Sequence, residues 1–325
     1  MALPRITVVA TGGTIAGSAS SATDATGYKA GTTGVDDLLA TIPELRGVAD
    51  LAAEQFAQVD SSDLTDELML ALARRVQELV DDAATDGVVI THGTDTLEES
   101  AYLLHLVLDT DKPVVLVGAM RPPTALSSDG PRNLFAAVTV AATAPAGLGV
   151  LVVMNDEIHT ARDVTKTSSL GVDAFASPYG PLGVLTDGRA AFYRAPLRPH
   201  TRQTGFGIPS SLPSSAILFA HSGLDERLAG SLAGYDVIVH AGFGNGTVSA
   251  RVVDALEAAR ASGSLVVRAT RTGSGTLTLV GASAAEANGW IAADDQNPQR
   301  ARLLASLALT ITRDPAVIQG MFHRY

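Results

Sequence analysis

Residues 66–108 read DELMLALARRVQELVDDAATDGVVITHGTDTLEESAYLLHLVL and alternate between two kinds of apolar pattern. Over 66–83 the apolar residues recur at spacings of three and four, which predicts an amphipathic helix. Residues 87–91 form a short apolar run that predicts a buried strand, and 97–108 predict a second helix. A strand that is apolar on both faces and lies between helices indicates a βαβ unit in a parallel sheet.

The same alternation continues on both sides of this stretch. Residues 6–10, 114–118 and 150–154 are further short apolar runs, which we expect to be strands. Residues 131–142 predict another helix, with Pro131 in the first turn, where a missing N–H costs nothing. The first part of the chain is therefore expected to be an α/β domain with a parallel sheet.

Periodicity is lost over residues 195–215, which are rich in Pro, Ser and Gly, and we interpret this segment as a linker. Beyond it the alternation resumes. The expected strands are 216–220, 237–240 and 265–269, and the expected helices are 248–261 and 298–310. The sequence thus predicts a larger N-terminal domain over 1–194 and a smaller α/β domain over 216–325.

Composition disfavours several classes of protein. The 325 residues carry 23 Lys and Arg against 34 Asp and Glu, and this net charge of −11 disfavours binding to nucleic acid or to an anionic membrane. The absence of cysteine excludes disulfides, a thiol nucleophile and cysteine-ligated metal, and the 7 histidines show no metal-ligand spacing. The longest apolar runs have the length of strands, far short of the roughly 20 residues of a membrane span.

Two glycine-flanked threonines follow strands of the predicted sheet. Residues 11–17 read TGGTIAG after the first strand, and 91–96 read THGTDT after the strand over 87–91. Ligands of open α/β sheets bind at the carboxyl ends of the strands, and glycines let a backbone approach a ligand closely. The two loops, with Thr14 and Thr94, therefore predict one site at this edge of the sheet.

Three other segments are candidates for the same site. The small, polar segment 17–34 contains one aromatic residue, Tyr28, and its place directly after the first loop is typical of a lid. The cluster Asp60-Ser61-Ser62-Asp63 and the RDVTKT of residues 162–167 resemble, when taken alone, a helix cap and a surface loop. The sequence contains no G-x-G-x-x-G, P-loop, nucleophile elbow or H-E-x-x-H motif.

Taken in order, these motifs resemble the signatures of the bacterial-type L-asparaginases. The resemblance runs from about residue 6 to residue 325. Its motifs are TGGTIA (11–16), THGTDTLEE (91–99), GAMRP (118–122), SDGPRN (128–133), RDVTKT (162–167) and GFGNG (242–246). Each motif alone is weak, but together and in this order they are specific.

The resemblance implies a flavodoxin-like N-terminal domain, a smaller α/β C-terminal domain and a homotetramer built as a dimer of intimate dimers. Each active site would lie between the N-terminal domain of one subunit and the C-terminal domain of its neighbour. The implied reaction is hydrolysis of the small-molecule substrate L-asparagine to L-aspartate and ammonia, with no cofactor and no metal.

In the family pattern, Thr14 attacks the amide carbon and forms an acyl-enzyme ester, and Tyr28 contacts Thr14 from the lid. Thr94, Asp95 and Lys166 form a second group, in which the ammonium favours loss of the threonine proton. An alkyl hydroxyl is a weak nucleophile that needs a base. Which threonine attacks stays open, as does whether the Tyr28–Thr14 pair or the Thr94–Lys166 pair supplies the base.

The same resemblance implies the substrate contacts. Ser61 and the neighbouring backbone would hold the α-carboxylate, and Asp95 would pair with the α-ammonium. The carbonyl of Ala119 would accept a hydrogen bond from the amide nitrogen, and Asn245 would come from the neighbouring subunit. The implied substrate-binding residues are Asp60, Ser61, Ser62, Thr94, Asp95, Ala119 and Asn245.

Two positions depart from the secreted, high-affinity branch of the family. Ser62 stands where a Gln or Glu often helps to bind the α-ammonium. Ala282 stands where the neighbouring subunit would supply a Glu, and Glu286 lies four residues further on. A charge-assisted hydrogen bond is worth about 1.5–3 kcal/mol, so losing one weakens binding on the order of 10- to 100-fold. We therefore expect modest affinity for L-asparagine and lower activity on L-glutamine.

Alternatives remain within and outside this enzyme class. An amidohydrolase that acts on L-glutamine or D-asparagine would carry similar motifs, whereas an amidotransferase subunit that acts on charged tRNA conflicts with the net charge of −11. A two-lobed amino-acid sensor would not need both threonines together with Tyr28 and Lys166. The N-terminus as written carries no signal peptide, which favours the cytoplasm; removal of a signal peptide would favour the periplasm or secretion.

Overall fold

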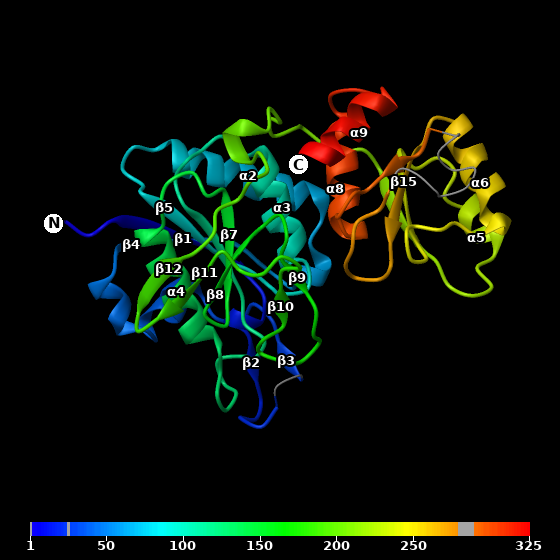
Figure 1. Ribbon diagram of the computed structural model, residues 1–325. Helices are drawn as coiled ribbons and strands as arrows, with labels where there is room; N and C mark the ends of the chain where they lie inside the picture. Colours follow the sequence, from blue (N-terminus) through cyan, green and yellow to red (C-terminus); the bar gives the residue numbers. More distant parts are fainter. Residues whose placement is uncertain (1, 25–26, 279–288) are drawn as a thin grey trace. The chain divides into compact units, whose positions relative to one another are not determined.

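The computed structural model describes residues 2–24, 27–278 and 289–325. The chain divides into two units, Met1–Ile208 and Pro209–Tyr325, and each unit has its own sheet (Figure 1). The boundary between the units lies within the segment 195–215. Several side chains of this segment are nevertheless buried: His200, Thr201, Thr204 and Phe206.

An eight-stranded sheet forms the centre of the first unit, in the order β12-β11-β8-β7-β6-β5-β1-β4. Its parallel part consists of β1 (Arg5–Gly12), β4 (Asp50–Val59), β5 (Gly87–Thr91), β6 (Val114–Val117) and β7 (Val150–Met154). The α/β class and the four strands expected here are confirmed. The edge strand β4 is an addition, because most of its residues are at least partly exposed and form no continuous apolar run.

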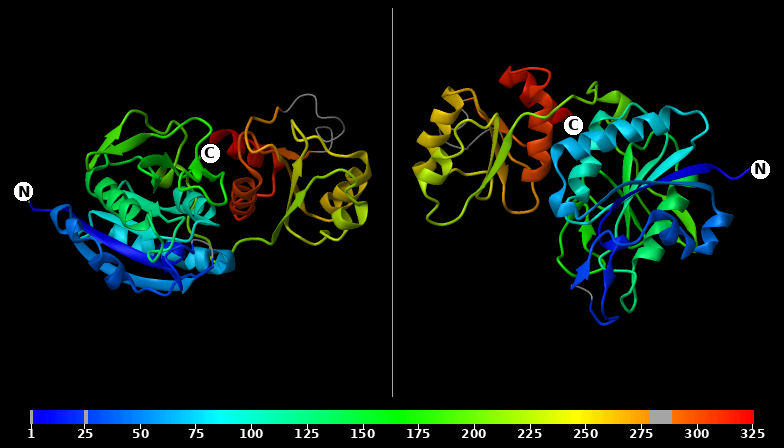
Figure 2. Two further views of the ribbon diagram at one scale, coloured as in Figure 1. Left: turned by 90° about the horizontal axis from the view of Figure 1, so that it is seen from below. Right: turned by 180° about the vertical axis from the view of Figure 1, so that it is seen from behind.

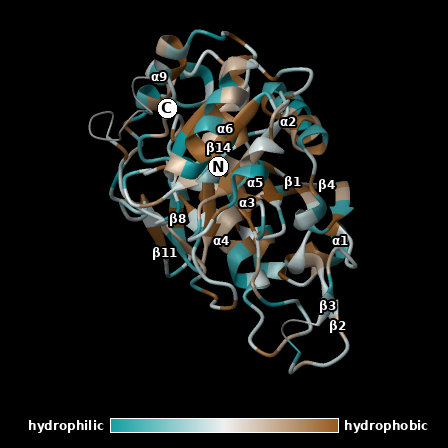
Figure 3. Cartoon of the chain, turned by 90° about the vertical axis from the view of Figure 1, so that its right-hand side faces the viewer, coloured by the Kyte–Doolittle hydropathy of each residue, from teal (hydrophilic) through white to brown (hydrophobic). Residues whose placement is uncertain are grey.

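Helices cover both faces of this sheet, as Figure 2 shows. The helices are α1 (Val35–Ala40), α2 (Asp66–Asp81), α3 (Leu97–Val107) and α4 (Gly130–Thr143). Ile6 and Val8 share a core with residues of α1 and α4, and Thr7 between them points to the other face of the sheet. α2 begins after Thr65, whose hydroxyl accepts a hydrogen bond from the N–H of Leu68, and it carries both hydrophilic and hydrophobic residues (Figure 3).

The sheet is mixed, and not parallel throughout as the sequence suggests. β8 (Glu157–Thr160), β11 (Gly183–Thr186) and β12 (Arg189–Phe192) run antiparallel to their neighbours. Two-residue turns, Asn155-Asp156 and Asp187-Gly188, join β7 to β8 and β11 to β12, with φ values from 50° to 72°. Positive φ at both central residues suits tight hairpins, and Asn, Asp and Gly adopt it most readily.

Some of the short elements of the first unit carry predicted site residues, namely β3, β9, η1 and η3. The short strands are β2 (Ser18–Ala19), β3 (Tyr28–Lys29), β9 (Thr165–Lys166) and β10 (Phe175–Ala176). The 3₁₀ turns are η1 (Thr14–Ala16), η2 (Pro43–Gly47), η3 (Ser61–Asp63) and η4 (Thr201–Gln203). β2 pairs with β3 and β9 with β10, so the predicted lid, 17–34, contains a short hairpin of its own.

The second unit contains a parallel four-stranded sheet in the order β13-β14-β15-β16. Its strands are β13 (Ser215–Phe219), β14 (Val237–Gly242), β15 (Leu265–Thr270) and β16 (Ile291–Ala292). Its described helices are α5 (Glu226–Gly230), α6 (Ala250–Ala261), α8 (Pro298–Leu309) and α9 (Pro315–Arg324). Ile238 and Val266 of the sheet share a core with Val252 and Leu256 of α6. The predicted smaller α/β domain is therefore confirmed.

The strand β14 buries a histidine at its centre. His240 is 0% exposed, and neither of its ring nitrogens has a hydrogen-bond partner among the residues that the structure describes. Arg268 lies beside it in register on β15. Burial lowers the pKa of His240 to about 4, so the ring is neutral at pH 7.

Replacing His240 by leucine is expected to make the chain less sensitive to acid. The unfolded chain protonates this ring near its ordinary pKa of 6.5, whereas the folded chain does so only near a pKa of about 4. The unfolded state therefore binds more protons between these values, and stability falls as the pH drops through this window. At about 1.4 kcal/mol per pKa unit, the loss reaches about 3 kcal/mol near pH 4.

Urea unfolding at pH 7 and at pH 4.5 measures this effect. His240→Leu should lose about 2–3 kcal/mol less than the wild type on acidification. His221→Leu, at an exposed position of the same unit, serves as the control. Equal acid losses in His240→Leu and in the wild type would contradict the prediction.

Candidate active site

The first glycine loop turns sharply after β1 and presents Thr14 at the start of η1. Gly12 and Gly13 have φ values of 110° and 78°. A Cβ at Gly12 would lie 2.4 Å from the carbonyl oxygen of Val59, and a Cβ at Gly13 would lie 2.3 Å from the Cα of Gly93. Only glycine fits at either position. The two glycines therefore pack the loop against the end of β4 and against the second glycine loop, and Thr14, which follows them, is 5% exposed.

The second glycine loop, after β5, is in contact with the segments that follow β4 and β6. A Cβ at Gly93 would lie 2.5 Å from Ser61 Oγ, and a Cβ at Gly118 would lie 2.9 Å from the methyl group of Thr94. These contacts bring together the segments that follow β1, β4, β5 and β6. The predicted residues of the first unit thus gather at the carboxyl edge of the sheet, where ligands bind in open α/β folds.

Thr14 is paired with the tyrosine of the predicted lid. Thr14 Oγ1 lies 2.5 Å from Tyr28 Oη, and either oxygen can donate the hydrogen bond. A Cβ at Gly17 would lie 3.0 Å from the Tyr28 ring, so the ring lies close against this glycine. At the base of the lid, the N–H of Gly31 donates to the carbonyl of Gly13 at 3.1 Å. The tyrosine oxygen is thereby positioned to exchange a proton with the threonine.

Thr94, Asp95 and Lys166 form a second hydrogen-bonded group. Lys166 Nζ donates to Thr94 Oγ1 at 2.9 Å and to Asp95 Oδ1 at 2.6 Å. The lysine side chain is 19% exposed and the Asp95 side chain is 58% exposed, so the carboxylate keeps an open side towards solvent. One ammonium thus bridges a buried hydroxyl and a carboxylate that remains accessible to a ligand.

Ser61 lies inside the site, while its neighbours Asp60 and Ser62 form hydrogen bonds with each other. Ser61 is 4% exposed, and its Oγ accepts a hydrogen bond from the N–H of Asp95 at 3.2 Å. Asp60 caps η3, and its carboxylate accepts from the N–H of Ser62 at 3.0 Å and from the Ser62 hydroxyl at 2.9 Å. Of this cluster, Ser61 makes the direct contact with the second glycine loop.

Ala119 lies in the loop after β6 and is 0% exposed. Asn133 Nδ2 fixes this loop by donating to the carbonyl of Gly118 at 3.1 Å. A Cβ at Gly130 would lie 3.4 Å from the Cβ of Ala119 and 3.3 Å from a side-chain carbon of Ile15. The start of α4 therefore holds the Ala119 loop next to η1.

Asn245 belongs to the second unit. Its Nδ2 donates to Thr278 Oγ1 at 2.7 Å, and its Oδ1 accepts from the N–H of Thr278 at 2.9 Å. Arg268, 2% exposed, donates to the carbonyl of Asn245 at 3.2 Å. Ala282 and Glu286, the candidate positions for a cross-subunit carboxylate, lie outside the described residues.

His92 stabilises the second glycine loop through a hydrogen bond to its backbone. Its Nδ1 lies 2.7 Å from the carbonyl of Gly93, and its Nε2 lies 2.9 Å from Ser100 Oγ. Burial lowers the pKa of this imidazole, although the hydrogen bond to Gly93 opposes the shift. A neutral ring that donates from Nδ1 and accepts at Nε2 satisfies both partners. Its role is structural, because one ring nitrogen is bonded to the loop and the other to Ser100 of α3.

Glu98 belongs to the motif over 91–99, but the sequence assigns it no role in the site. Its side chain is buried in the first turn of α3, and Oε2 accepts 2.6 Å hydrogen bonds from Thr165 Oγ1 and from the N–H of Lys166. Acidic residues are common in the first turn of any helix, because they interact favourably with its dipole. The sequence therefore contains no signal that separates this buried carboxylate from an exposed one.

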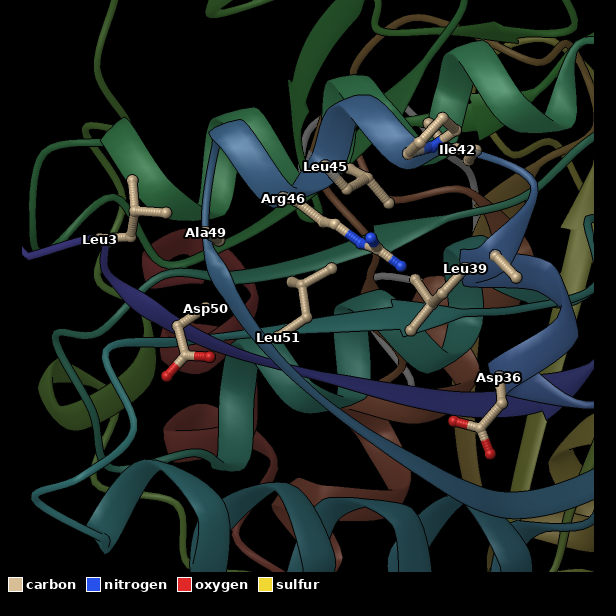
Figure 4. Close-up of a pocket in the computed structure, with 11 residues that line it drawn as sticks. Leu3, Asp36, Leu39, Ile42, Leu45, Arg46, Ala49, Asp50 and Leu51 are labelled. Carbon is tan, nitrogen blue, oxygen red and sulfur yellow. The ribbon is translucent and has the colours of Figure 1, made fainter.

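A surface pocket of the first unit lies elsewhere. It has a volume of about 470 Å³, and Leu3, Arg46 and Asp50 are among its lining residues (Figure 4). Leu3 precedes β1 and Asp50 begins β4, so the pocket lies at the amino ends of these strands, opposite the glycine loops. Among the described residues, no group of His, Asp and Glu side chains is arranged to hold a metal ion. None of the helices in the described ranges is long and apolar enough to cross a membrane.

The geometry fits acyl transfer by a hydroxyl. Thr14 and Thr94 each have a close partner, a tyrosine oxygen and a lysine ammonium respectively, that can take part in proton transfer. The two threonine loops are in contact through Gly13 and Gly93. A nucleophile, a proton route and converging backbone groups within one edge of a sheet are the elements that such a reaction requires.

Comparison with known families finds two matches that cover most of the chain. The family model described as "Asparaginase, N-terminal" matches residues 5–198, and the model described as "Glutaminase/Asparaginase C-terminal domain" matches residues 216–322.

Individual relatives match this chain over nearly its whole length. The chain is 45% identical to the L-asparaginase 2 of Escherichia coli strain K12, over 100% of this chain and 94% of the relative. It is 44% identical to the glutaminase-asparaginase of Pseudomonas fluorescens biotype A, over 99% of this chain and 91% of the relative. The crystal structure of a probable cytoplasmic L-asparaginase from Campylobacter jejuni superimposes with a TM-score of 0.96 at 44% identity, and covers 99% of this chain and 100% of the other.

Proposed function

Because the chain belongs to the asparaginase family and is an amidohydrolase, we propose that it hydrolyses L-asparagine to L-aspartate and ammonia through a threonine ester. The observation that carries this proposal is the pair of threonine hydroxyls in contacting loops, each with its own proton partner. The exposed side of Asp95 supports a substrate with an α-ammonium group.

In the first half of the proposed reaction, Thr14 Oγ1 attacks the carbon of the side-chain amide, and its proton moves to the Tyr28 oxygen 2.5 Å away while the Tyr28 hydroxyl passes its own proton on towards the amide nitrogen. Backbone N–H groups of the two glycine loops stabilise the negative charge on the amide oxygen. The C–N bond then breaks, the nitrogen takes up a proton and leaves as ammonia, and an aspartyl ester of Thr14 remains. The carbonyl of Ala119 accepts a hydrogen bond from the amide nitrogen and orients it.

In the second half, water hydrolyses the ester. Lys166, Thr94 and Asp95 form the hydrogen-bonded route by which the water loses its proton. The ester C–O bond breaks, Thr14 regains a proton, and L-aspartate leaves. Ser61 holds the α-carboxylate and Asp95 the α-ammonium throughout, so that an amide without the amino-acid head leaves these groups without partners and is disfavoured.

The initial rate of ammonia release from purified protein tests the proposal. We expect L-asparagine to be hydrolysed faster than L-glutamine, D-asparagine or succinamate, which lacks the α-ammonium. We also expect a KM above the low-micromolar range, because Ser62 is engaged by Asp60 and offers no carboxylate to the substrate.

Each contrary outcome has a distinct meaning. A KM in the low-micromolar range would overturn the predicted modest affinity but not the reaction. A higher kcat/KM for L-glutamine or D-asparagine would mean that this amide, and not L-asparagine, is the preferred substrate of the enzyme. Binding of L-asparagine in calorimetry without ammonia release would favour an amino-acid sensor and overturn the enzyme proposal.

The proposal extends to the assembly and the compartment. In a homotetramer built from intimate dimers, Asn245 of the partner subunit would complete the substrate site. The name of the Campylobacter jejuni relative supports a cytoplasmic location, which we adopt for this chain.

A further inference from the structure

We infer that Glu98 is a positioning residue for the reaction, because it fixes the segment that carries Lys166 onto the start of α3. This inference rests on the proposed function. Glu98 Oε2 accepts hydrogen bonds from the Thr165 hydroxyl and from the backbone N–H of Lys166. It acts through Lys166, whose backbone it binds on one side while Thr94 and Asp95 bind the ammonium on the other.

Lys166 is held by hydrogen bonds both at its backbone and at the end of its side chain. The backbone N–H donates to Glu98 Oε2 at 2.6 Å, and Nζ donates to Thr94 Oγ1 at 2.9 Å. Thr165, the preceding residue, adds a second 2.6 Å hydrogen bond to the same carboxylate oxygen. A four-carbon side chain with free rotations would otherwise place its ammonium over a wide range.

The fold explains why such an anchor is needed. Lys166 lies in the two-residue strand β9, which pairs with β10 and not with the main sheet. Thr94 and Asp95 follow β5, a buried strand of the main sheet, and Glu98 comes one turn later, at the start of α3. Glu98 therefore holds the β9–β10 hairpin, which is remote in sequence, next to the start of α3 and the second glycine loop.

The expected effect follows from the precision that proton transfer demands. A displacement of about 1 Å in a reacting group lowers a rate by about 10²-fold. Glu98→Ala is therefore expected to lower kcat for L-asparagine by about 10²-fold, with a smaller change in KM. Glu98→Gln retains a carbonyl oxygen that can accept both hydrogen bonds, and should recover most of this loss.

Thr165→Val provides an independent variant that keeps the carboxylate and removes one of the two donors. We expect a loss in kcat between those of Glu98→Gln and Glu98→Ala. The matched control is Thr167→Val on the same hairpin, because the Thr167 hydroxyl donates to the carbonyl of Ala174 at 3.2 Å and not to α3. This control should keep the wild-type kcat.

Initial rates of ammonia release and melting temperatures of the full-length variants complete the test. A purely structural role would lower the melting temperature and leave kcat unchanged below it. A kcat for Glu98→Ala within about twofold of the wild type would overturn the inference, as would equal losses in Thr165→Val and Thr167→Val. If Glu98→Ala does not fold, the comparison of Glu98→Gln, Thr165→Val and Thr167→Val decides.

The failure of the proposed function gives a different result. In that case the wild type itself releases no ammonia from any of the amides, and the positioning role fails with it. If the wild type is active, Lys166→Met is inactive and Glu98→Ala is fully active, only the role of Glu98 is overturned.

Discussion

Thr14→Val is expected to lower kcat for L-asparagine by about 10³- to 10⁶-fold, the range seen when a hydroxyl nucleophile is removed. Valine keeps the shape of a side chain that is 5% exposed, but it lacks the oxygen that lies 2.5 Å from Tyr28 Oη. The turn at Thr14 is set by Gly12 and Gly13 and not by the hydroxyl. The variant should therefore fold normally, and its ammonia release measures the loss of the nucleophile alone.

A buried threonine outside the site provides the control for this variant. Thr139 is 3% exposed, and its hydroxyl donates to the carbonyl of Phe135 within α4. Thr139→Val should keep full activity. Mass spectrometry of enzyme that is quenched in acid during turnover should find the ester on the peptide that contains Thr14. An ester on Thr94, or turnover by Thr14→Val, would reverse the assignment of the nucleophile.

Lys166→Met is expected to lower kcat by about 10²- to 10⁴-fold, as is typical when a proton-transfer group is removed. Methionine keeps most of the apolar stem and loses the ammonium that bridges Thr94 and Asp95. Because the Asp95 carboxylate is 58% exposed, solvent screens the ion pair and its loss should change stability little. Kinetics and a thermal melt of the same sample separate the two effects.

Lys112→Met is the matched control, since Lys112 Nζ donates to the carbonyl of Asp82 and not to a group of the site. It should leave kcat unchanged. Lys166→Ala opens space at the position of the ammonium, and added ethylamine should restore part of its activity. An unchanged kcat in Lys166→Met would contradict the proposed proton route.

Patterns in the sequence predict those elements that are buried in a regular way. The strands β5, β6 and β7 are buried along their whole length, so their apolar runs are continuous and easily found. β4 lies at an edge and β12 near the surface, and their mixed exposure leaves no such run. The antiparallel hairpins depend on turn residues, Asn155-Asp156 and Asp187-Gly188, whose significance is clear only beside the strands they join.

The candidate site could be predicted only as far as its chemistry lies in short motifs. The place of the two glycine loops after strands predicts one site, and the resemblance adds Ser61 and Lys166; in the first unit these residues lie together. Glu98 is part of the motif over 91–99, but its role could not be predicted in this way, because its partners lie 67 and 68 residues further along the chain. Whether a carboxylate in a first helical turn is buried depends on tertiary packing, which no local pattern encodes.

The contact between Gly13 and Gly93 has a consequence for how this enzyme can diverge. A Cβ at Gly13 would meet main-chain atoms of His92 and Gly93, so no change of a side chain can make room for it, whereas a Cβ at Gly93 would first meet the side chain of Ser61. A substitution at either glycine therefore disturbs a neighbouring part of the site, and the two loops constrain each other in evolution. New substrate preferences can arise more easily in the segments around them, such as 17–24, 27–33 and 120–128, where several side chains face solvent. A directed-evolution library for a new substrate should therefore vary these surrounding segments and leave the two glycine loops unchanged.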